Sequence, residues 1–308
     1  MKEMEYMNVV GNKQTATVID KSIWQPILHQ FEVPFGVKQP SNWQPKEGLI
    51  SESFEIDGVP VEHLYNTNGE KSGKVILNIH GGGYVWGLID ASRVTAQMYL
   101  DYAKGAEVYS VDYRIAPPNV HPAALEDCIT VYKWLIEKGY KGENIIFAGE
   151  SAGGGLILAL TLYLKDHQMP LPKGVLAISP WADVKFEAAS RTINFTNDAV
   201  LGKGGYESLY GQIQKSDYAG VSNLEDPYLS PLYGDYEGFP SLLIQVGTYE
   251  VLYDDSVCLA KKAELSGVDV KLTSYYGMSH CFQELFVDIP ESKQAWKEIG
   301  EFISKCFE

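Results

Sequence analysis

Two glycine-rich motifs, each placed directly after an apolar run, carry the residue types that nucleophilic chemistry requires. The first is His80-Gly81-Gly82-Gly83, and the second, about seventy residues later, is Gly149-Glu150-Ser151-Ala152-Gly153. The second has the G-x-S-x-G pattern, in which a serine stands on a sharp turn between a strand and a helix. Together the motifs predict a serine that attacks an acyl carbon while backbone N–H groups stabilise the oxyanion.

The surroundings of both motifs favour this interpretation over simpler ones. G-x-S-x-G alone recurs by chance, but here an apolar strand pattern over 145–148 precedes it and a helical pattern over 151–165 follows. Gly149 and Gly153 leave room for a close approach of strand and helix. A glycine run can also be a plain turn or a phosphate loop, but a phosphate loop needs Lys and Ser or Thr after its glycines, and Tyr84 follows here.

A nucleophilic serine needs a base, and histidine is the side chain best suited to neutral pH. Of the six histidines, His280 alone follows the last predicted strand. Catalytic groups of open α/β sheets lie at the carboxyl ends of the strands, and the chain order expected here is serine, acid, histidine. His280 is therefore the predicted base; a surface-loop histidine without a catalytic role is the alternative.

The acid should follow the preceding strand, and three carboxylates stand there: Glu250, Asp254 and Asp255. Glu250 falls in the loop after the strand, whereas the two aspartates fall in the first turn of the next helix. There they would cap N–H groups and interact favourably with the helix dipole. Glu250 is the favoured acid, and Asp254 stays open as the alternative.

Composition narrows the classes of partner. The 308 residues are 45% hydrophobic and 21% charged, and the net charge of −15 disfavours nucleic acids and anionic membranes. There is no long apolar run for a membrane span and no apolar leader at the start, so we expect a cytoplasmic protein. Four scattered cysteines without a C-x-x-C pattern argue against a zinc or redox site.

From residue 74 onward, strand and helix patterns alternate, which predicts a mostly parallel sheet covered on both faces. Before it, an antiparallel pair should turn at Asp57-Gly58. Residues 1–48 and 184–238 break the pattern and are rich in aromatics; we interpret them as an N-terminal cap segment and a cap insertion over a core of 49–183 and 239–308. The predicted strands are 75–79, 106–112, 145–149, 174–179, 241–247 and 269–275, and the predicted helices are 91–103, 122–138, 151–165, 252–266 and 290–306.

The combined motifs resemble those of the hormone-sensitive-lipase-like family of α/β-hydrolase carboxylesterases. The resemblance spans roughly residues 75–285. Besides the two glycine motifs, it includes Val111-Asp112-Tyr113-Arg114-Ile115-Ala116-Pro117, Pro122-Ala123-Ala124-Leu125-Glu126-Asp127, Ser179-Pro180-Trp181 and Asp226-Pro227-Tyr228-Leu229-Ser230-Pro231.

This resemblance implies an α/β-hydrolase fold with an eight-stranded sheet under a helical cap. It implies Ser151 as nucleophile, His280 as base, and an oxyanion hole formed by the N–H groups of Ala152 and of two glycines among Gly81, Gly82 and Gly83, with Gly82 and Gly83 favoured. The family's acid motif is Asp-Pro-Leu-x-Asp; here Glu250 fills the first position, an accepted variant, and Asp254 stands four residues on. Glu150, which precedes the nucleophile, has no assigned role.

The resulting prediction is a serine carboxylesterase that hydrolyses short-acyl esters, from acetyl to about octanoyl, through an acyl-enzyme. The expected partner is a small-molecule ester, with no metal, no organic cofactor, no nucleic acid and no membrane; the oligomeric state, a homodimer included, stays open. An arylformamidase or amidase, a long-chain lipase, and a non-catalytic ligand-binding protein of the same fold are the alternatives.

Overall fold

A nine-stranded sheet runs through the computed structural model, which describes residues 7–19, 38, 41–67, 72–103, 105–185, 187–203 and 217–308. The strand order is β1-β9-β8-β7-β6-β4-β5-β3-β2. The pairs from β1 to β5 are parallel, while β3 pairs antiparallel with both β2 and β5. The catalytic candidates therefore follow strands of the parallel part of the sheet.

The strands are β1 (Met7–Val10), β2 (Leu49–Ile56), β3 (Val59–Asn66), β4 (Val75–Ile79), β5 (Glu107–Val111), β6 (Ile145–Glu150), β7 (Gly174–Ile178), β8 (Ser241–Gly247) and β9 (Val270–Tyr275). The α-helices are α2 (Asp90–Tyr102), α3 (Ala123–Glu137), α4 (Ala152–Asp166), α5 (Ser190–Ile193), α7 (Tyr253–Leu265), α8 (Phe282–Leu285) and α9 (Pro290–Phe307). Short 3₁₀ turns are η2 (Gly142–Asn144), η3 (Asp217–Ala219) and η4 (Pro231–Tyr233).

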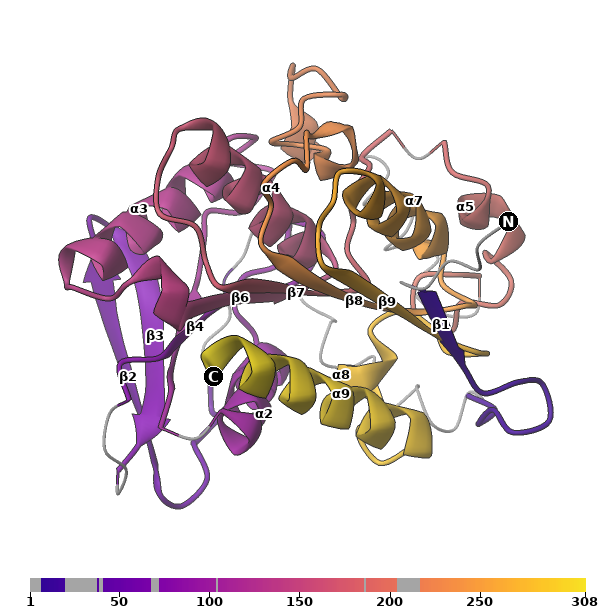
Figure 1. Cartoon of the computed structure of the whole chain (residues 1–308), viewed down its shortest axis with the longest axis horizontal. Coiled ribbons are helices and arrows are strands. Elements are labelled where there is room, and N and C mark those ends of the chain that lie inside the picture. The colour runs from indigo at the N-terminus through magenta and orange to yellow at the C-terminus, as the bar shows by residue number, and fades with distance from the viewer. Residues whose placement is uncertain are drawn as a thin grey trace.

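Helices cover both faces of the sheet (Figure 1). On one face α3, α4 and α7 pack against the strands and form the larger hydrophobic core. On the other face α2 and α9 form the smaller core, with α8 beside them. Because the central strands are buried on both faces, their sequences are almost entirely apolar.

The predicted alternation of strands and helices is confirmed, with boundaries that shift by about one residue. The turn at Asp57-Gly58 is confirmed as well, and both residues have positive φ, at 49° and 83°. The predicted count of eight strands is wrong, because Met7–Val10 adds a ninth, β1, parallel to β9. Its four residues are half-buried or exposed, so the sequence carries no alternation to mark it.

The two proposed cap segments are only partly described. Between β7 and β8, the described residues hold α5, η3 and η4 and no strand, as the irregular sequence there predicts. Five aromatic residues of the two proposed cap segments lie outside the described residues: Trp24, Phe31, Phe35, Tyr206 and Tyr210. Their assignment to a cap stays a prediction. Among the helices that the structure describes, none is long and apolar enough to cross a bilayer.

Glycines set the distance between α4 and the sheet. A Cβ atom on Gly153 would lie 2.0 Å from the backbone oxygen of Ile79 and 2.5 Å from that of His80. A Cβ on Gly149 would lie 2.7 Å from the Gly153 oxygen. All three distances are far below van der Waals contact, so only glycine permits this approach of the helix to the ends of β4 and β6.

We predict that Gly153→Ala destabilises the protein by about 3 kcal/mol or more, because rigid backbone oxygens must move to admit the methyl group. Gly154→Ala is the matched control, since its nearest contact is 3.0 Å, to Pro180 Cα. Both changes replace a helical glycine by alanine and gain the same helix propensity. The difference between their urea unfolding midpoints therefore reports the stronger steric clash at position 153. Equal midpoints for the two variants would show that the close approach does not constrain the fold.

Candidate active site

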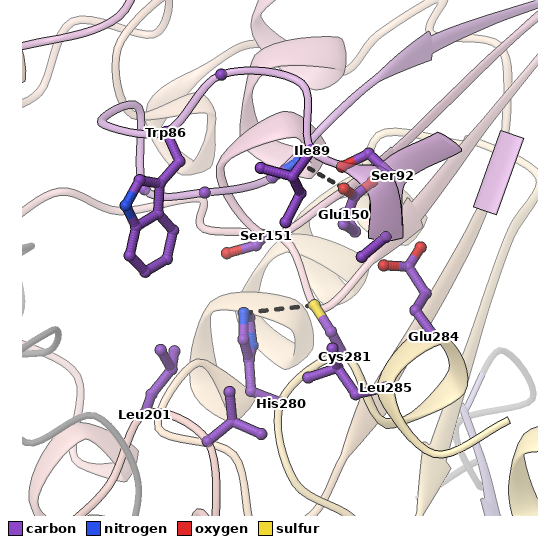
Figure 2. A pocket seen from close by; sticks show the side chains of 16 residues that line it. Trp86, Ile89, Ser92, Glu150, Ser151, Leu201, His280, Cys281, Glu284 and Leu285 are labelled. Carbon is purple, nitrogen blue, oxygen red and sulfur yellow. Dashed lines mark hydrogen bonds between the residues drawn. The ribbon is translucent and has the colours of Figure 1, made fainter. Parts of the chain in front are cut away.

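The pocket at the carboxyl ends of the central strands brings both glycine motifs together with the candidate base. His80 follows β4, Ser151 follows β6 and His280 follows β9. Ser151, His280 and the three glycines 81–83 line one pocket. Figure 2 shows the Ser151 side chain and the His280 imidazole on facing sides of it, with Trp86 and Leu201 at one end.

Ser151 occupies the turn between β6 and α4 in a backbone conformation that L-residues rarely adopt, with φ 54° and ψ −119°. Three hydrogen bonds hold it there. Its N–H donates to Ile178 O at 2.9 Å, and its own carbonyl accepts from Trp181 N at 2.9 Å and Gly155 N at 3.0 Å. The neighbouring strand and its loop therefore fix the strained turn that projects the hydroxyl into the pocket.

His280 and Glu250 form a buried pair. The His280 Nδ1 atom lies 3.1 Å from Glu250 Oε2, and the two side chains are 5% and 0% exposed. The other ring nitrogen, Nε2, lies 3.4 Å from Cys281 Sγ on the pocket wall. The carboxylate therefore holds the nitrogen that faces the protein and leaves Nε2 on the pocket side.

Burial dominates the electrostatics of this pair. It lowers the pKa of His280 to about 4, while the nearby Asp198 carboxylate acts in the opposite direction. It also raises the pKa of Glu250 well above its usual value, and donors to Oε1 oppose that rise: Gly247 N at 2.5 Å and Ser179 Oγ at 2.7 Å. The imidazole is consequently neutral at pH 7, which is the state in which it can accept a proton.

The alternative acid, Asp254, lies elsewhere. Its Oδ2 accepts from the Ser190 backbone N–H at 2.8 Å, at the start of α5. Asp255 accepts from Ala182 N and Asp183 N and pairs with Arg191. The expectation that these aspartates cap N–H groups of their own helix is wrong, because both carboxylates accept N–H groups of the segment after β7 and tie α7 to it.

The glycine loop is held from two sides. Gly82 and Gly83 have φ values of +106° and +60°, which suit glycine. His80 braces the loop from behind: its Nδ1 lies 2.7 Å from Gly81 O, and its ring stacks on Tyr113 with centroids 4.2 Å apart. From the elbow side, Glu150 Oε1 accepts the Gly81 N–H at 2.6 Å.

The hydrogen bond from the Gly81 N–H to Glu150 Oε1 gives Glu150 a role that the sequence does not reveal, and it changes the prediction for Gly81. The Gly81 N–H is used within the protein, so it does not fit the oxyanion-donor role given to it with its neighbours. The N–H groups of Gly82, Gly83 and Ala152 remain the candidates, and all three residues belong to the turns that meet at Ser151.

Several positioning residues escape sequence reasoning. Asp198, in the proposed cap insertion, accepts from Val251 N through Oδ2 at 3.0 Å and from Val200 N through Oδ1 at 3.0 Å, and His280 N lies 3.4 Å from Oδ1. Asn194 donates to Glu250 O at 2.8 Å. No motif marks either residue, because the partners that link them to the acid and base loops are backbone groups more than fifty residues away in the chain. Ser179, within the resemblance motif Ser179-Pro180-Trp181, joins the acid and base loops through Glu250 and Cys281 N.

Comparison with known proteins agrees with this geometry. Residues 76–284 match a protein family described by the alpha/beta hydrolase fold. An acetyl-hydrolase of Streptomyces hygroscopicus is 34% identical over 281 residues, covering 85% of this chain and 92% of that protein. An esterase of Acinetobacter venetianus is 36% identical over 231 residues, covering 74% of each chain.

A solved structure extends the match to three dimensions. The crystal structure of an esterase from the bacterial hormone-sensitive lipase family has a TM-score of 0.82 and 34% identity, and the match covers 94% of this chain and 98% of that one. The fold and the site thus define an α/β hydrolase. Within that class, the chain belongs to the hormone-sensitive-lipase-like family of carboxylesterases, as the sequence motifs predict.

We predict that Asp198→Asn lowers kcat by about tenfold or more, because an amide has one acceptor oxygen for N–H groups of both triad loops. The Asp198 charge raises the pKa of His280. Its removal should therefore lower that pKa and move the acid limb of the kcat/KM profile to lower pH.

Asp226→Asn is the matched control, since Asp226 lies in the same segment and accepts from Tyr228 N of its own loop. Its pH profile should equal that of the wild type. An unchanged acid limb in Asp198→Asn, or the same shift in both variants, would contradict a positioning role for Asp198.

Proposed function

We propose that this protein is a serine carboxylesterase that cleaves short-acyl esters through a covalent acyl-enzyme on Ser151. The observation that carries the proposal is the buried His280–Glu250 pair, at 3.1 Å, in the same pocket as a serine on a strained strand–helix turn. Membership of a family of carboxylic ester hydrolases supports the class of reaction. The mechanism below follows from the side chains in the pocket.

In the first half-reaction, Ser151 Oγ attacks the ester carbonyl carbon while His280 Nε2 accepts its proton. Glu250 holds the proton on Nδ1 and stabilises the imidazolium that forms. For this step Nε2 must bond to Ser151 Oγ rather than to Cys281 Sγ, as in sites whose catalytic hydrogen bonds form only when substrate binds. Collapse of the tetrahedral intermediate then breaks the bond to the alcohol oxygen, which takes the proton from Nε2.

In the second half-reaction, water replaces the alcohol. His280 accepts a proton from the water as its oxygen attacks the acyl carbon, and then returns the proton to Ser151 Oγ as the carboxylic acid leaves. The oxyanion of both intermediates binds to the N–H groups of Gly82, Gly83 and Ala152. The positive end of the α4 dipole lies under the last of these, which favours the negative oxygen.

The N–H of Gly81 serves the oxyanion hole indirectly. Its bond to Glu150 Oε1 joins the glycine loop to the elbow, so the donors from the two motifs keep a fixed separation. A preorganised set of donors stabilises the transition state without reorganisation at the moment of reaction. A ligand-binding protein of this fold would not need such an arrangement together with a complete base and acid.

The test of the proposal is Ser151→Ala. We expect it to fold normally and to lose activity on p-nitrophenyl butyrate by about a millionfold in kcat, as other triads do without their nucleophile. Diethyl p-nitrophenyl phosphate should add its phosphoryl group to the wild type at Ser151 and not to the variant. Covalent label on another residue, or turnover in the variant, would refute the assignment; faster turnover of N-formylkynurenine would favour the arylformamidase.

The next prediction separates the two candidate acids. In Glu250→Gln, the donors Gly247 N and Ser179 Oγ would hold the amide oxygen, which leaves the NH₂ group facing Nδ1–H. Two donors then oppose each other and favour the wrong tautomer, so kcat should fall by up to about ten-thousandfold. Circular dichroism melts identify any loss of folded protein.

Asp254→Asn is the matched comparison. An asparagine oxygen can still accept from Ser190 N, so its effect on kcat should be small and its cost in stability about 1 kcal/mol or less. A nearly silent Glu250→Gln beside an inactive Asp254→Asn would transfer the catalytic role to Asp254.

The last prediction concerns acyl length. The net charge of −15 disfavours adsorption to anionic lipid surfaces, one kind of interface at which long-chain esters collect. We expect kcat/KM on p-nitrophenyl esters to be highest for acetate or butyrate and to fall beyond about eight acyl carbons, as for an enzyme that takes dissolved esters rather than an interface. A higher kcat/KM on emulsified long-chain triglyceride would contradict this.

A further inference from the structure

Two carboxyl groups without a cation line the pocket beside the nucleophile. They belong to Glu150, at the end of β6, and to Glu284, in α8. Figure 2 shows both to the right of Ser151, on the side away from Trp86 and Leu201, with Ser92 next to Glu150. The proposed mechanism uses neither group to transfer a proton, so their place in the substrate pocket calls for a separate explanation.

Each carboxyl group has an oxygen that the protein leaves unsatisfied. Glu150 is 6% exposed; its Oε1 holds Gly81 N, whereas its buried Oε2 has no hydrogen-bond partner among the described residues. The buried Oε1 of Glu284 likewise has no partner there. An unsatisfied buried carboxyl oxygen costs free energy, so a ligand that reaches these two residues by a small side-chain adjustment gains by donating a hydrogen bond to either atom.

The pocket wall supplies no positive charge for them. Its described lining residues include no lysine or arginine, and those beside the two acids are Ile89, Ser92, Cys281 and Leu285. From α2, the Thr95 hydroxyl hydrogen-bonds to Glu284, and the Tyr99 hydroxyl lies near both acids. An anionic substrate group would be repelled there, and an alkyl group would leave both oxygens unsatisfied. The matching ligand group is small, uncharged and able to donate a hydrogen bond.

The protonation states of the two acids favour a hydroxyl as the ligand group. Burial raises the pKa of Glu150 to about 7, and burial together with the Glu150 charge raises the pKa of Glu284 well above its usual value. Near neutral pH the pair therefore presents both an O–H donor and carboxyl acceptors. A hydroxyl can donate and accept at once, whereas an ammonium group only donates.

We propose that Glu150, Glu284 and Ser92 form a polar subsite that selects esters carrying a hydroxyl group close to the ester bond. The inference rests on the proposed esterase function and adds a substrate class to it: short esters of hydroxy acids or of polyols. The subsite differs from the oxyanion hole, because it acts through side-chain oxygens and binds a part of the substrate that does not react.

The experiment compares two matched pairs of substrates. p-Nitrophenyl butyrate and p-nitrophenyl 3-hydroxybutyrate differ by a hydroxyl in the acyl part, and propyl acetate and glycerol 1-acetate differ by hydroxyls in the alcohol part. For each pair the ratio of kcat/KM, hydroxylated over plain, is measured for the wild type, Glu284→Leu, Glu284→Gln and the control Glu264→Leu, whose site on α7 is exposed.

We expect a wild-type ratio of about ten or more in one pair, since a site built to bind a hydroxyl discriminates against its absence. Glu284→Leu should reduce that ratio to near one. Glu284→Gln, which keeps a donor and an acceptor, should retain most of it, and Glu264→Leu should not change it. Wild-type ratios near one in both pairs would overturn the subsite and indicate that water satisfies the two oxygens.

A preference that survives Glu284→Leu would overturn it as well. These results are distinct from failure of the proposed function, in which the wild type would hydrolyse none of the four esters. Thermal melts of the Leu and Gln variants separate lost preference from lost fold, and the wild-type ratios decide the question even where a variant does not fold.

Discussion

The tight turn at Ser151 is the constraint on which the rest of the site depends. The serine has φ 54°, and the turn exists because Gly149 and Gly153 admit backbone carbonyls where any side chain would collide. The strain is balanced by the packing of α4 between the sheet and the segment after β7, where Trp181 N bonds to Ser151 O. The same close approach places the first N–H groups of α4 beside the glycine loop. The packing of α4 on the sheet therefore fixes the positions of both the nucleophile and the oxyanion donors.

A second network joins the acid and the base to elements far apart in the chain. Ser179 bonds to Glu250 and to the backbone after His280, and Asp198 receives N–H groups from the loops of both. Burial disfavours the charge of each group, and donors from Gly247 and Ser179 reduce that cost for the carboxylate. The result is a base that is neutral before reaction and has a partner ready for its charged form.

Much of this arrangement follows from local sequence, and some of it does not. The elbow, the glycine loop, the central strands and His280 are marked by glycine spacing, apolar runs and chain order, which act over a few residues. β1 escapes because an exposed edge of four residues needs no alternation. The roles of Asp198, Asn194 and Glu284 are equally invisible, since they depend on contacts with groups 53 to about 190 residues away, which only the folded chain brings near. Gly81 shows a different limit of the sequence. Its motif predicts a backbone N–H donor for the oxyanion, but it does not reveal that this N–H donates to Glu150 instead.

The central claim is that Ser151 attacks while Gly82, Gly83 and Ala152 bind the oxyanion and Gly81 stays on Glu150. A crystal structure of the protein inhibited by an alkyl phosphonate tests it most directly, because the tetrahedral phosphorus copies the intermediate. We expect the phosphorus on Ser151 Oγ and its oxygen at about 2.7–3.1 Å from those three backbone nitrogens. A phosphoryl oxygen that points away from them, or a Gly81 N–H that has left Glu150 to bind it, would contradict the account.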